Sequence, residues 1–231
     1  VVQLGGAATG GRDVFSPLVH LTGGALKKTE FVRVKSNAEL DAAIAKAQGH
    51  KITGCDNNPF NEFTQKLNKN ILSVGHHPKH LNGVDILAVT PAIYSLDPKN
   101  SELLSAKEKG IKVLTWQRVL GSYLTKNKYT VAVCGTHGKS TTTAMIGELL
   151  EDAGMDPTVE LGAIVPKWGA NYRAGNSKYF VVEADEYNDN FLAISPDITV
   201  VTNIEYDHPE YFKNIGQVYE SFKKFLLQTK N

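Results

Sequence analysis

The sequence YTVAVCGTHGKSTTT at residues 129–143 constrains the fold more than any other stretch of the chain. An apolar, β-branched run ends at Cys134, a short glycine-containing loop follows, and a helical pattern then continues as far as Gly154. A helix that begins directly after such a loop exposes unpaired backbone N–H groups and the positive end of its dipole, so it attracts phosphate. The stretch therefore predicts a strand, a phosphate-binding loop and a helix.

The residue types in this loop suit a nucleotide. Gly135 and Gly138 allow the backbone to approach phosphate oxygens without a Cβ in the way. Lys139 carries a charge that can reach a β- or γ-phosphate, and Ser140 offers a hydroxyl to Mg²⁺. The full P-loop pattern has a glycine where this chain has Val133, so the loop is a shortened variant. The alternative interpretation is an ordinary glycine turn in a βα unit.

The composition narrows the class of protein. A chain of 231 residues with 42% hydrophobic and 21% charged residues is typical of one large or two modest globular domains. The net charge of +1 gives no reason to expect nucleic acid, and no apolar run approaches the roughly 20 residues that cross a bilayer. We see no signal peptide, and the two cysteines lie far apart in the sequence. We therefore expect a cytoplasmic protein without membrane insertion.

Strand and helix patterns alternate from Glu30 onward, and this alternation predicts an α/β fold with a parallel, doubly wound sheet. We expect a Rossmann-like domain at 30–125 and a P-loop NTPase-like domain at 126–231, with a polar hinge between them. Residues 1–29 are rich in glycine and are treated as an unassigned, flexible lead-in. The expected strands are 31–34, 51–54, 71–74, 84–90, 111–114, 129–134, 158–161, 179–183 and 198–201. In addition to the helix that follows the glycine loop, the expected helices are 38–48, 101–109, 116–124 and 212–228.

Two features of the first domain have open interpretations. Asp56 follows the second strand of a βαβ unit, where an acidic residue often holds a ribose hydroxyl, but it equally suits the cap of a helix that begins near Pro59. His76, His77 and His80 cluster around a proline, and their spacing suits no helical pair of metal ligands. We expect the histidine segment to be a surface loop.

Polar residues also follow two strands of the second domain. Residues 183–187 read EADEY, and Asn203 is followed by Glu205, Asp207 and His208. In a parallel α/β sheet the ligand lies beyond the carboxyl ends of the strands. We therefore expect these groups to meet Lys139 and Ser140 around one nucleotide and its metal, because carboxylate and hydroxyl oxygens suit Mg²⁺. The alternative is that they are solvated strand caps.

The motifs GTHGKSTTT, VVEADEYNDNFL and VTNIEYDHPEYF resemble those of the Mur ligases of peptidoglycan synthesis. Upstream, GHKITGCD, VDILAVTPAI and LLSAKEKGIKVLTW are similar to the UDP-sugar-binding domain of the same family. The resemblance extends from about residue 49 to residue 231. Within the family, the branch that adds L-alanine to UDP-N-acetylmuramate is the most similar, and the branch that recycles murein peptides is the alternative.

The resemblance implies an ATP-dependent ligase of cell-wall synthesis. ATP would phosphorylate the carboxylate of UDP-N-acetylmuramate to an acyl phosphate, which the amine of L-alanine would attack. Lys139, Glu183 and His208 would be the catalytic residues, and Ser140, Glu183 and His208 would ligate Mg²⁺. The remaining implied contacts are Gly135, Thr136, His137, Gly138, Lys139, Ser140, Thr141 and Asn203 for ATP, and Asp56, His137 and Arg173 for the substrate.

The chain departs from the family at both ends. The family opens with a GxGGxGMSG loop after its first strand, but the matching place here reads FVRVKSNAELDAA, without glycine. One interpretation is that residues 1 to about 48 are foreign sequence joined to a ligase fragment, in which the sheet is intact but its pyrophosphate loop is lost. The family also continues beyond the last residue present here, so we expect a truncated central domain that binds ATP–Mg²⁺ weakly and forms no amide bond. Another P-loop phosphotransferase and a non-catalytic nucleotide-binding module are the alternatives.

Overall fold

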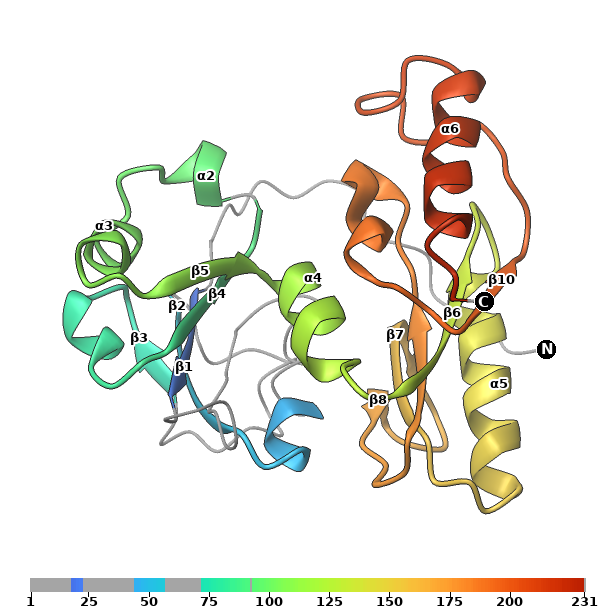
Figure 1. The fold of residues 1–231 in the computed structure, drawn as a ribbon, viewed down its shortest axis with the longest axis horizontal. Helices are drawn as coiled ribbons and strands as arrows, with labels where there is room; N and C mark the ends of the chain where they lie inside the picture. Colours follow the sequence, from blue (N-terminus) through green and yellow to red (C-terminus); the bar gives the residue numbers. More distant parts are fainter. Residues whose placement is uncertain (1–17, 23–43, 57–71, 92, 231) are drawn as a thin grey trace.

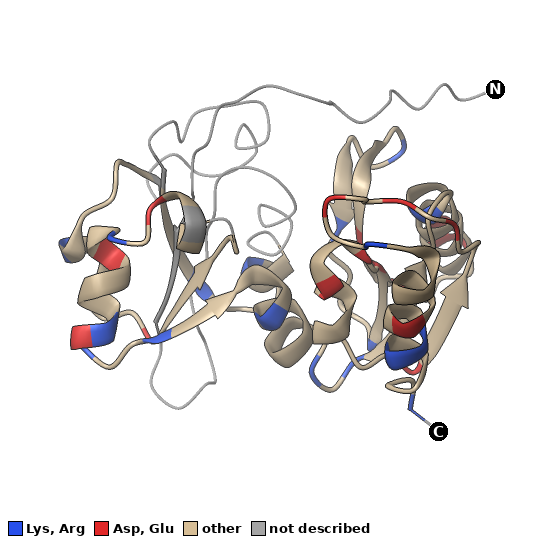
Figure 2. Cartoon of the chain, turned by 90° about the horizontal axis from the view of Figure 1, so that it is seen from above, with Lys and Arg blue, Asp and Glu red and all other residues tan. Residues whose placement is uncertain are grey.

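The computed structural model describes residues 18–22, 44–56, 72–91 and 93–230. They form two α/β lobes, each built on a five-stranded sheet (Figure 1). The predicted α/β fold with a Rossmann-like part followed by a nucleotide-loop part is confirmed. Basic and acidic residues are interspersed over both lobes in the view of Figure 2. Among the described helices, none is long and apolar enough to cross a membrane.

The first sheet has the strand order β3-β2-β1-β4-β5. β2 is parallel to β3 and β4 is parallel to β5, as predicted, but β1 runs antiparallel to both β2 and β4. The expectation of a wholly parallel sheet is therefore wrong at its centre. The strands are β1 (Leu18–Thr22), β2 (Lys51–Asp56), β3 (Leu72–Val74), β4 (Ile86–Val89) and β5 (Lys112–Thr115).

β1 lies within the segment that we expected to be a lead-in, so that expectation is corrected for residues 18–22. An unpaired strand edge in the middle of a sheet is unfavourable, and a strand of either direction can fill it, because antiparallel ladders satisfy the backbone as well as parallel ones. The strand predicted at 31–34 lies outside the described residues. The helix predicted at 38–48 is described only at 44–47, and Gly49 follows it with a φ of +86°.

Short helices connect the strands of the first lobe. The predicted helix at 116–124 is α-helical at first and then widens to a π-helical turn, in which the Thr125 hydroxyl donates to the carbonyls of Leu120 and Gly121. The described helices are η3 (Pro78–Leu81), α2 (Ile93–Leu96), α3 (Ser101–Glu108), α4 (Trp116–Val119) and η4 (Leu120–Leu124).

The second sheet has the order β10-β6-β9-β7-β8, parallel throughout except for β8, which pairs antiparallel with β7. Its strands are β6 (Tyr129–Cys134), β7 (Thr158–Val165), β8 (Ala170–Arg173), β9 (Tyr179–Glu183) and β10 (Ile198–Val201). Its helices are α5 (Lys139–Asp152), η5 (Tyr187–Ala193) and α6 (Ile215–Leu226).

Alternate residues of β6 enter two different cores, because successive side chains of a strand point to opposite faces. Val131 packs with the partly buried residues of α5, whereas Ala132 and Cys134 belong to the core that contains Phe222 and Phe225 of α6. The sheet is therefore covered by α5 on one face and by α6 and η5 on the other. This sandwich fixes the carboxyl end of β6, where the loop begins.

The two lobes meet through η4 and η5. Gly121 of η4 lies against the backbone of Ala193, so closely that a Cβ at residue 121 would stand 2.6 Å from the Ala193 carbonyl carbon. Next to this contact, the Gln117 side chain donates a hydrogen bond of 2.9 Å to the Asn190 side chain. Buried apolar residues of both lobes also belong to one cluster, so the lobes are packed against each other beside the segment that follows β9.

Candidate active site

The glycine loop joins β6 to α5 as the sequence predicts. β6 ends at Cys134 and α5 begins at Lys139, and Gly138 occupies the N-cap of α5 with φ +81°. No side chain caps this helix. An N-terminus without a side-chain cap directs backbone N–H groups toward any ligand beyond the loop, which is the arrangement that binds phosphate.

The loop is held in place by the segment that leaves β10. The Thr136 N–H donates to the Asn203 carbonyl at 3.0 Å, and the His137 N–H donates to the Asn203 side-chain oxygen at 2.9 Å. Thr202 Oγ1 donates to the His137 carbonyl at 2.6 Å. Gly135 has φ +136°, and a Cβ there would stand 2.8 Å from the Asn203 carbonyl oxygen. Asn203, which the resemblance placed near the nucleotide, therefore shapes the loop itself.

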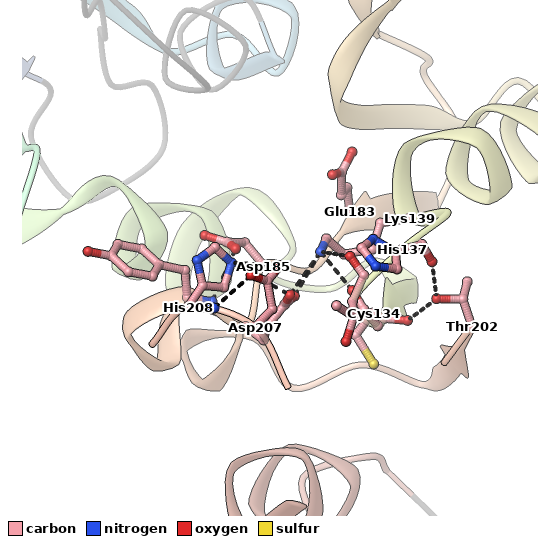
Figure 3. A network of polar contacts seen from close by, with 12 residues as sticks. Cys134, His137, Lys139, Glu183, Asp185, Thr202, Asp207 and His208 are labelled. Atoms are coloured by element: carbon pink, nitrogen blue, oxygen red, sulfur yellow. Dashed lines mark hydrogen bonds and ion pairs between the residues drawn. The ribbon is translucent and has the colours of Figure 1, made fainter. Parts of the chain in front are cut away.

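Lys139 forms a buried ion pair with Glu186 (Figure 3). Its Nζ lies 2.9 Å and 3.1 Å from the two carboxylate oxygens and also donates to the Gly135 carbonyl at 2.7 Å. The exposed fraction is 14% for the Lys139 side chain and 3% for that of Glu186. Burial raises the pKa of Glu186, and the charge of Lys139 opposes that rise. The pair holds a cation against the loop.

His208 reaches the same carboxylate from the other side. Its Nε2 lies 3.9 Å from Glu186 Oε1, its Nδ1 lies 3.3 Å from Glu210 Oε1, and its ring lies 4.9 Å from that of Tyr187. The backbone of His208 has φ +54°, a conformation that costs free energy and that often marks functional residues. The structure thus brings Lys139 and His208 together, with Glu186 between them.

Glu183 is the last residue of β9, and its Oε2 accepts a hydrogen bond of 2.6 Å from the Gly162 N–H. Among the described residues, no hydrogen bond joins Glu183 to Lys139. The sequence predicts the acidic role in the EADEY segment for Glu183, whereas the carboxylate that contacts Lys139 belongs to Glu186. The available signal was that Glu183 and Glu186 both stand in that short segment, directly after a predicted strand.

Ser140 and Thr141 begin α5, next to the loop. Both border a largely apolar hollow of about 170 Å³ that is also lined by Met145 and Ile164. His137 lies on the surface, and its Nε2 is 4.0 Å from Glu205 Oε2. His137 is therefore an exposed residue of the loop, and Ser140 and Thr141 stand at the start of the helix that follows it.

Two of the predicted substrate contacts lie elsewhere. Arg173 pairs with Glu151 at 3.0 Å and with Asp156 at 2.8 Å, beside the C-terminal end of α5. Because a helix rises about 1.5 Å per residue, that end lies about 18 Å from Lys139. Asp56 ends β2 in the first sheet, opposite Val74. The structure does not bring Arg173 to the loop, and the residues in which a helix capped by Asp56 is predicted lie outside the described part of the chain.

A polar hollow of about 280 Å³ opens between the lobes. It is bordered by Thr115, Gln117 and Arg118 from the first lobe and by Asn188 and Asn190 from the second. Asn188 has φ +55°, and Asn190 donates to Asp185 at 2.9 Å, so this side of the hollow is continuous with the segment that carries Glu186.

The fold and the loop together define an α/β protein of the phosphate-loop, nucleotide-binding class. Residues 133–231 match the Mur ligase middle domain. The chain is 43% identical over 189 residues to the UDP-N-acetylmuramate–L-alanine ligase of Caldicellulosiruptor saccharolyticus. The aligned region covers 81% of this chain and 41% of that protein. The chain is 41% identical over 186 residues to the enzyme of the same name from Caldanaerobacter subterraneus subsp. tengcongensis, covering 80% and 40%. Residues 133–231 therefore carry a Mur ligase middle domain, and the resemblance of the motifs to the Mur ligase family is confirmed.

Solved structures agree with this assignment. The UDP-N-acetylmuramate-alanine ligase of Thermotoga maritima is 30% identical with a TM-score of 0.58, over 68% of this chain and 36% of that one. The UDP-N-acetylmuramate:L-alanyl-gamma-D-glutamyl-meso-diaminopimelate ligase of Neisseria meningitides shares the fold, with a TM-score of 0.73 at 23% identity, over 85% of this chain and 66% of that one. The chain spans about 40% of the length of the curated relatives.

Proposed function

We propose that this chain is part of an ATP-dependent ligase that joins L-alanine to the carboxylate of UDP-N-acetylmuramate in peptidoglycan synthesis. One observation carries the proposal: an uncapped phosphate loop stands beside Lys139, Glu186 and His208 in a chain whose relatives have that name. The loop and the charged cluster supply the nucleotide end of the reaction. The sugar and the amino acid would bind on the side that faces the first lobe.

The residues of the loop fit a nucleoside triphosphate and Mg²⁺. Gly135 leaves no room for a Cβ, so the backbone stays close to whatever binds at the helix start. Lys139 supplies the cation, and Ser140 and Glu183 supply oxygen ligands of the kind that Mg²⁺ prefers. When bound, ATP provides the phosphoryl group that activates a carboxylate. The task of this chain's residues is to hold and neutralise its phosphates.

Glu186 acts as a positioning residue in this proposal. It fixes the ammonium of Lys139 beside the Gly135 carbonyl, so the cation is in place before a nucleotide arrives. A preorganised charge in a buried site contributes more to phosphate binding than a mobile surface lysine does, because water screens it less. His208, whose Nε2 lies 3.9 Å from the same carboxylate, extends this charged cluster.

The substrate side is proposed to be the hollow between the lobes. It carries the guanidinium of Arg118 and the amides of Gln117 and Asn188, which are groups that hydrogen-bond phosphate and sugar. It also adjoins η5, the segment that directly follows Glu186. A UDP-sugar bound there would direct its carboxylate toward the loop.

The test is calorimetric titration of the full chain with ATP–Mg²⁺ and, separately, with UDP-N-acetylmuramate. Lys139→Ala removes a charge-assisted contact worth about 1.5–3 kcal/mol, so we expect the ATP affinity to fall by about tenfold or more. Lys167→Ala is the matched control, because Lys167 pairs with Asp152 and Glu151 at the other end of α5.

Lys139→Ala leaves a buried carboxylate without its cation, so the double variant Lys139→Ala/Glu186→Gln is titrated as well. Loss of affinity in both variants, with the Lys167→Ala value unchanged, supports the proposal. Absence of heat with ATP–Mg²⁺, or an unchanged affinity in the folded double variant, refutes it.

The alternative is that the amine substrate is a peptide rather than L-alanine, because the name of the Neisseria ligase includes a peptide. The higher identity to the L-alanine-adding relatives, 43% against 23%, favours L-alanine. ADP release measured with UDP-N-acetylmuramate plus either amine distinguishes the two. Release that depends on the peptide alone would assign the chain to the recycling branch.

A further inference from the structure

A second cluster of reactive side chains lies in the first lobe, away from the phosphate loop. Cys55 of β2, His76 and Glu102 of α3 place one ligand atom each within 4.8 Å of one another. Cys55 Sγ is 3.3 Å from His76 Nδ1 and 3.3 Å from each oxygen of Glu102. Cys55 and Glu102 are both fully buried.

Three separate elements build this cluster. β2 delivers Cys55 next to its last residue, and His76 comes just after β3, the strand that pairs with β2. α3 begins at the Asn100 cap, whose side-chain oxygen accepts from the Glu102 N–H at 2.9 Å, so Glu102 stands in the first turn and faces inward. The sequence analysis expected a surface loop at the histidines, because spacing within that segment alone gives no ligand pair. The missing partners come from β2 and α3.

We propose that Cys55, His76 and Glu102 form a binding site for a zinc ion. Thiolate sulfur, imidazole nitrogen and carboxylate oxygen are the three ligand types that zinc takes in proteins. With Zn–S near about 2.3 Å and Zn–N near about 2.0 Å, a tetrahedral ion places sulfur and nitrogen about 3.5 Å apart, close to the 3.3 Å observed. Mg²⁺ and Ca²⁺ are disfavoured because they require oxygen ligands.

The groups around the ligands also match a metal site. His80 Nδ1 lies 2.7 Å from Glu102 Oε1, and the His77 backbone N–H donates to the same oxygen at 2.8 Å. Such outer contacts orient a ligating carboxylate. Three protein ligands leave the fourth position of the tetrahedron to water. A hydrogen-bonded cluster without metal, in which the Cys55 thiol donates to Glu102, is the competing arrangement.

Metal analysis of the full chain, purified in the presence of zinc and then dialysed, decides between the two. We expect about one zinc per chain, lost in Cys55→Ser and in His76→Asn. His77→Asn is the matched control, because the His77 ring accepts a hydrogen bond from the Lys79 N–H and asparagine can replace that contact. His80→Gln should weaken zinc binding by about 10–100-fold.

A chain without bound zinc, or zinc content unchanged in both Cys55→Ser and His76→Asn, would overturn the proposal. If those variants do not fold, Co²⁺ is titrated into Cys134→Ala, in which Cys55 is the remaining thiol. A thiolate-to-cobalt absorption band supports the site, and its absence overturns it. Neither readout depends on nucleotide binding, so the outcome is independent of the proposed ligase function.

Discussion

Gly135→Ala is the sharpest test of the loop geometry. The residue has φ +136°, a conformation that side chains with a Cβ rarely adopt. The added Cβ would also collide with the Thr202 hydroxyl, and it would stand 2.8 Å from the carbonyl oxygen and 3.0 Å from the nitrogen of Asn203. Both Asn203 atoms belong to the backbone that pairs with Thr136, so they have little freedom to move.

The loss of stability expected in Gly135→Ala is the sum of the backbone strain and the steric collision. A strained backbone conformation costs about 1–3 kcal/mol, and an overpacked contact that shifts backbone costs about 1–3 kcal/mol more. The sum of about 2–6 kcal/mol is a large part of the 5–15 kcal/mol by which domains are usually stable. We therefore expect Gly135→Ala to unfold at a clearly lower urea concentration than the parent chain.

Gly138→Ala is the matched control within the same loop. Gly138 has φ +81°, but the nearest atom to its Cβ would be Thr202 Cγ2 at 3.9 Å, an ordinary contact. Only the conformational cost of about 1–2 kcal/mol remains. The difference between the two variants therefore reports mainly the collision of the added Cβ with Thr202 and Asn203.

The assay is equilibrium urea unfolding followed by circular dichroism, with the slope against denaturant checked in each variant. If Gly135→Ala is no less stable than Gly138→Ala at equal slopes, the loop does not pack against Asn203 as described. In that case the account of how the phosphate loop is shaped fails.

Three further outcomes are expected. Lys139→Ala should lower the free energy of unfolding by about 3–5 kcal/mol because it leaves Glu186 buried and unpaired, and Lys139→Met/Glu186→Gln should recover much of that loss in the same urea assay. The hydrogen bond from the Trp168 indole, with help from nearby cations, lowers the pKa of Glu151 from 4.5 to about 2. The contribution of Glu151 to the free energy of unfolding is thus present above pH 4.5 and lost toward pH 2. Glu151→Gln should therefore flatten the fall in melting temperature over that pH range, and equal pH profiles of melting temperature in the variant and the parent chain would contradict this. Burial, with the nearby Glu186 charge, raises the pKa of Cys134 to about 12, so its alkylation at pH 8, followed by mass spectrometry, should be far slower in the native than in the unfolded chain.

The elements around the loop could be predicted because local sequence determines them. The β-branched run, the glycines and the helix pattern of residues 129–154 correspond to β6 and α5 within a residue or two. β9 and β10 also have the predicted bounds. β8 was missed, because its sequence ANYR is short and half-buried and is specified by the hairpin with β7 rather than by its own pattern. β1 was missed for a related reason, since its partners β2 and β4 are distant in sequence.

The charged site could be predicted only in part. Sequence spacing placed acidic residues at the end of β9, but it did not decide which carboxylate faces Lys139. That choice depends on how the chain turns after the strand, where the Phe191 N–H returns to the Asp185 carbonyl and directs Glu186 inward. The prediction that Arg173 contacts the substrate near the loop was wrong for a similar reason, because the sequence does not reveal the β7–β8 hairpin that carries Arg173.

The two ends of α5 have different roles. This difference explains how the protein remains stable although the loop and the helix N-terminus are unfavourable by themselves. The N-terminal end has glycine in place of a capping side chain, which costs roughly a few tenths of a kcal/mol, and it follows two glycines whose positive φ angles would strain any other residue. The C-terminal end is fixed by Arg173, whose guanidinium joins Glu151 to Asp156. Packing on β6, β7 and β9 secures the helix between these ends. The loop can therefore keep its N–H groups directed at a ligand because the stability of α5 is supplied elsewhere along its length.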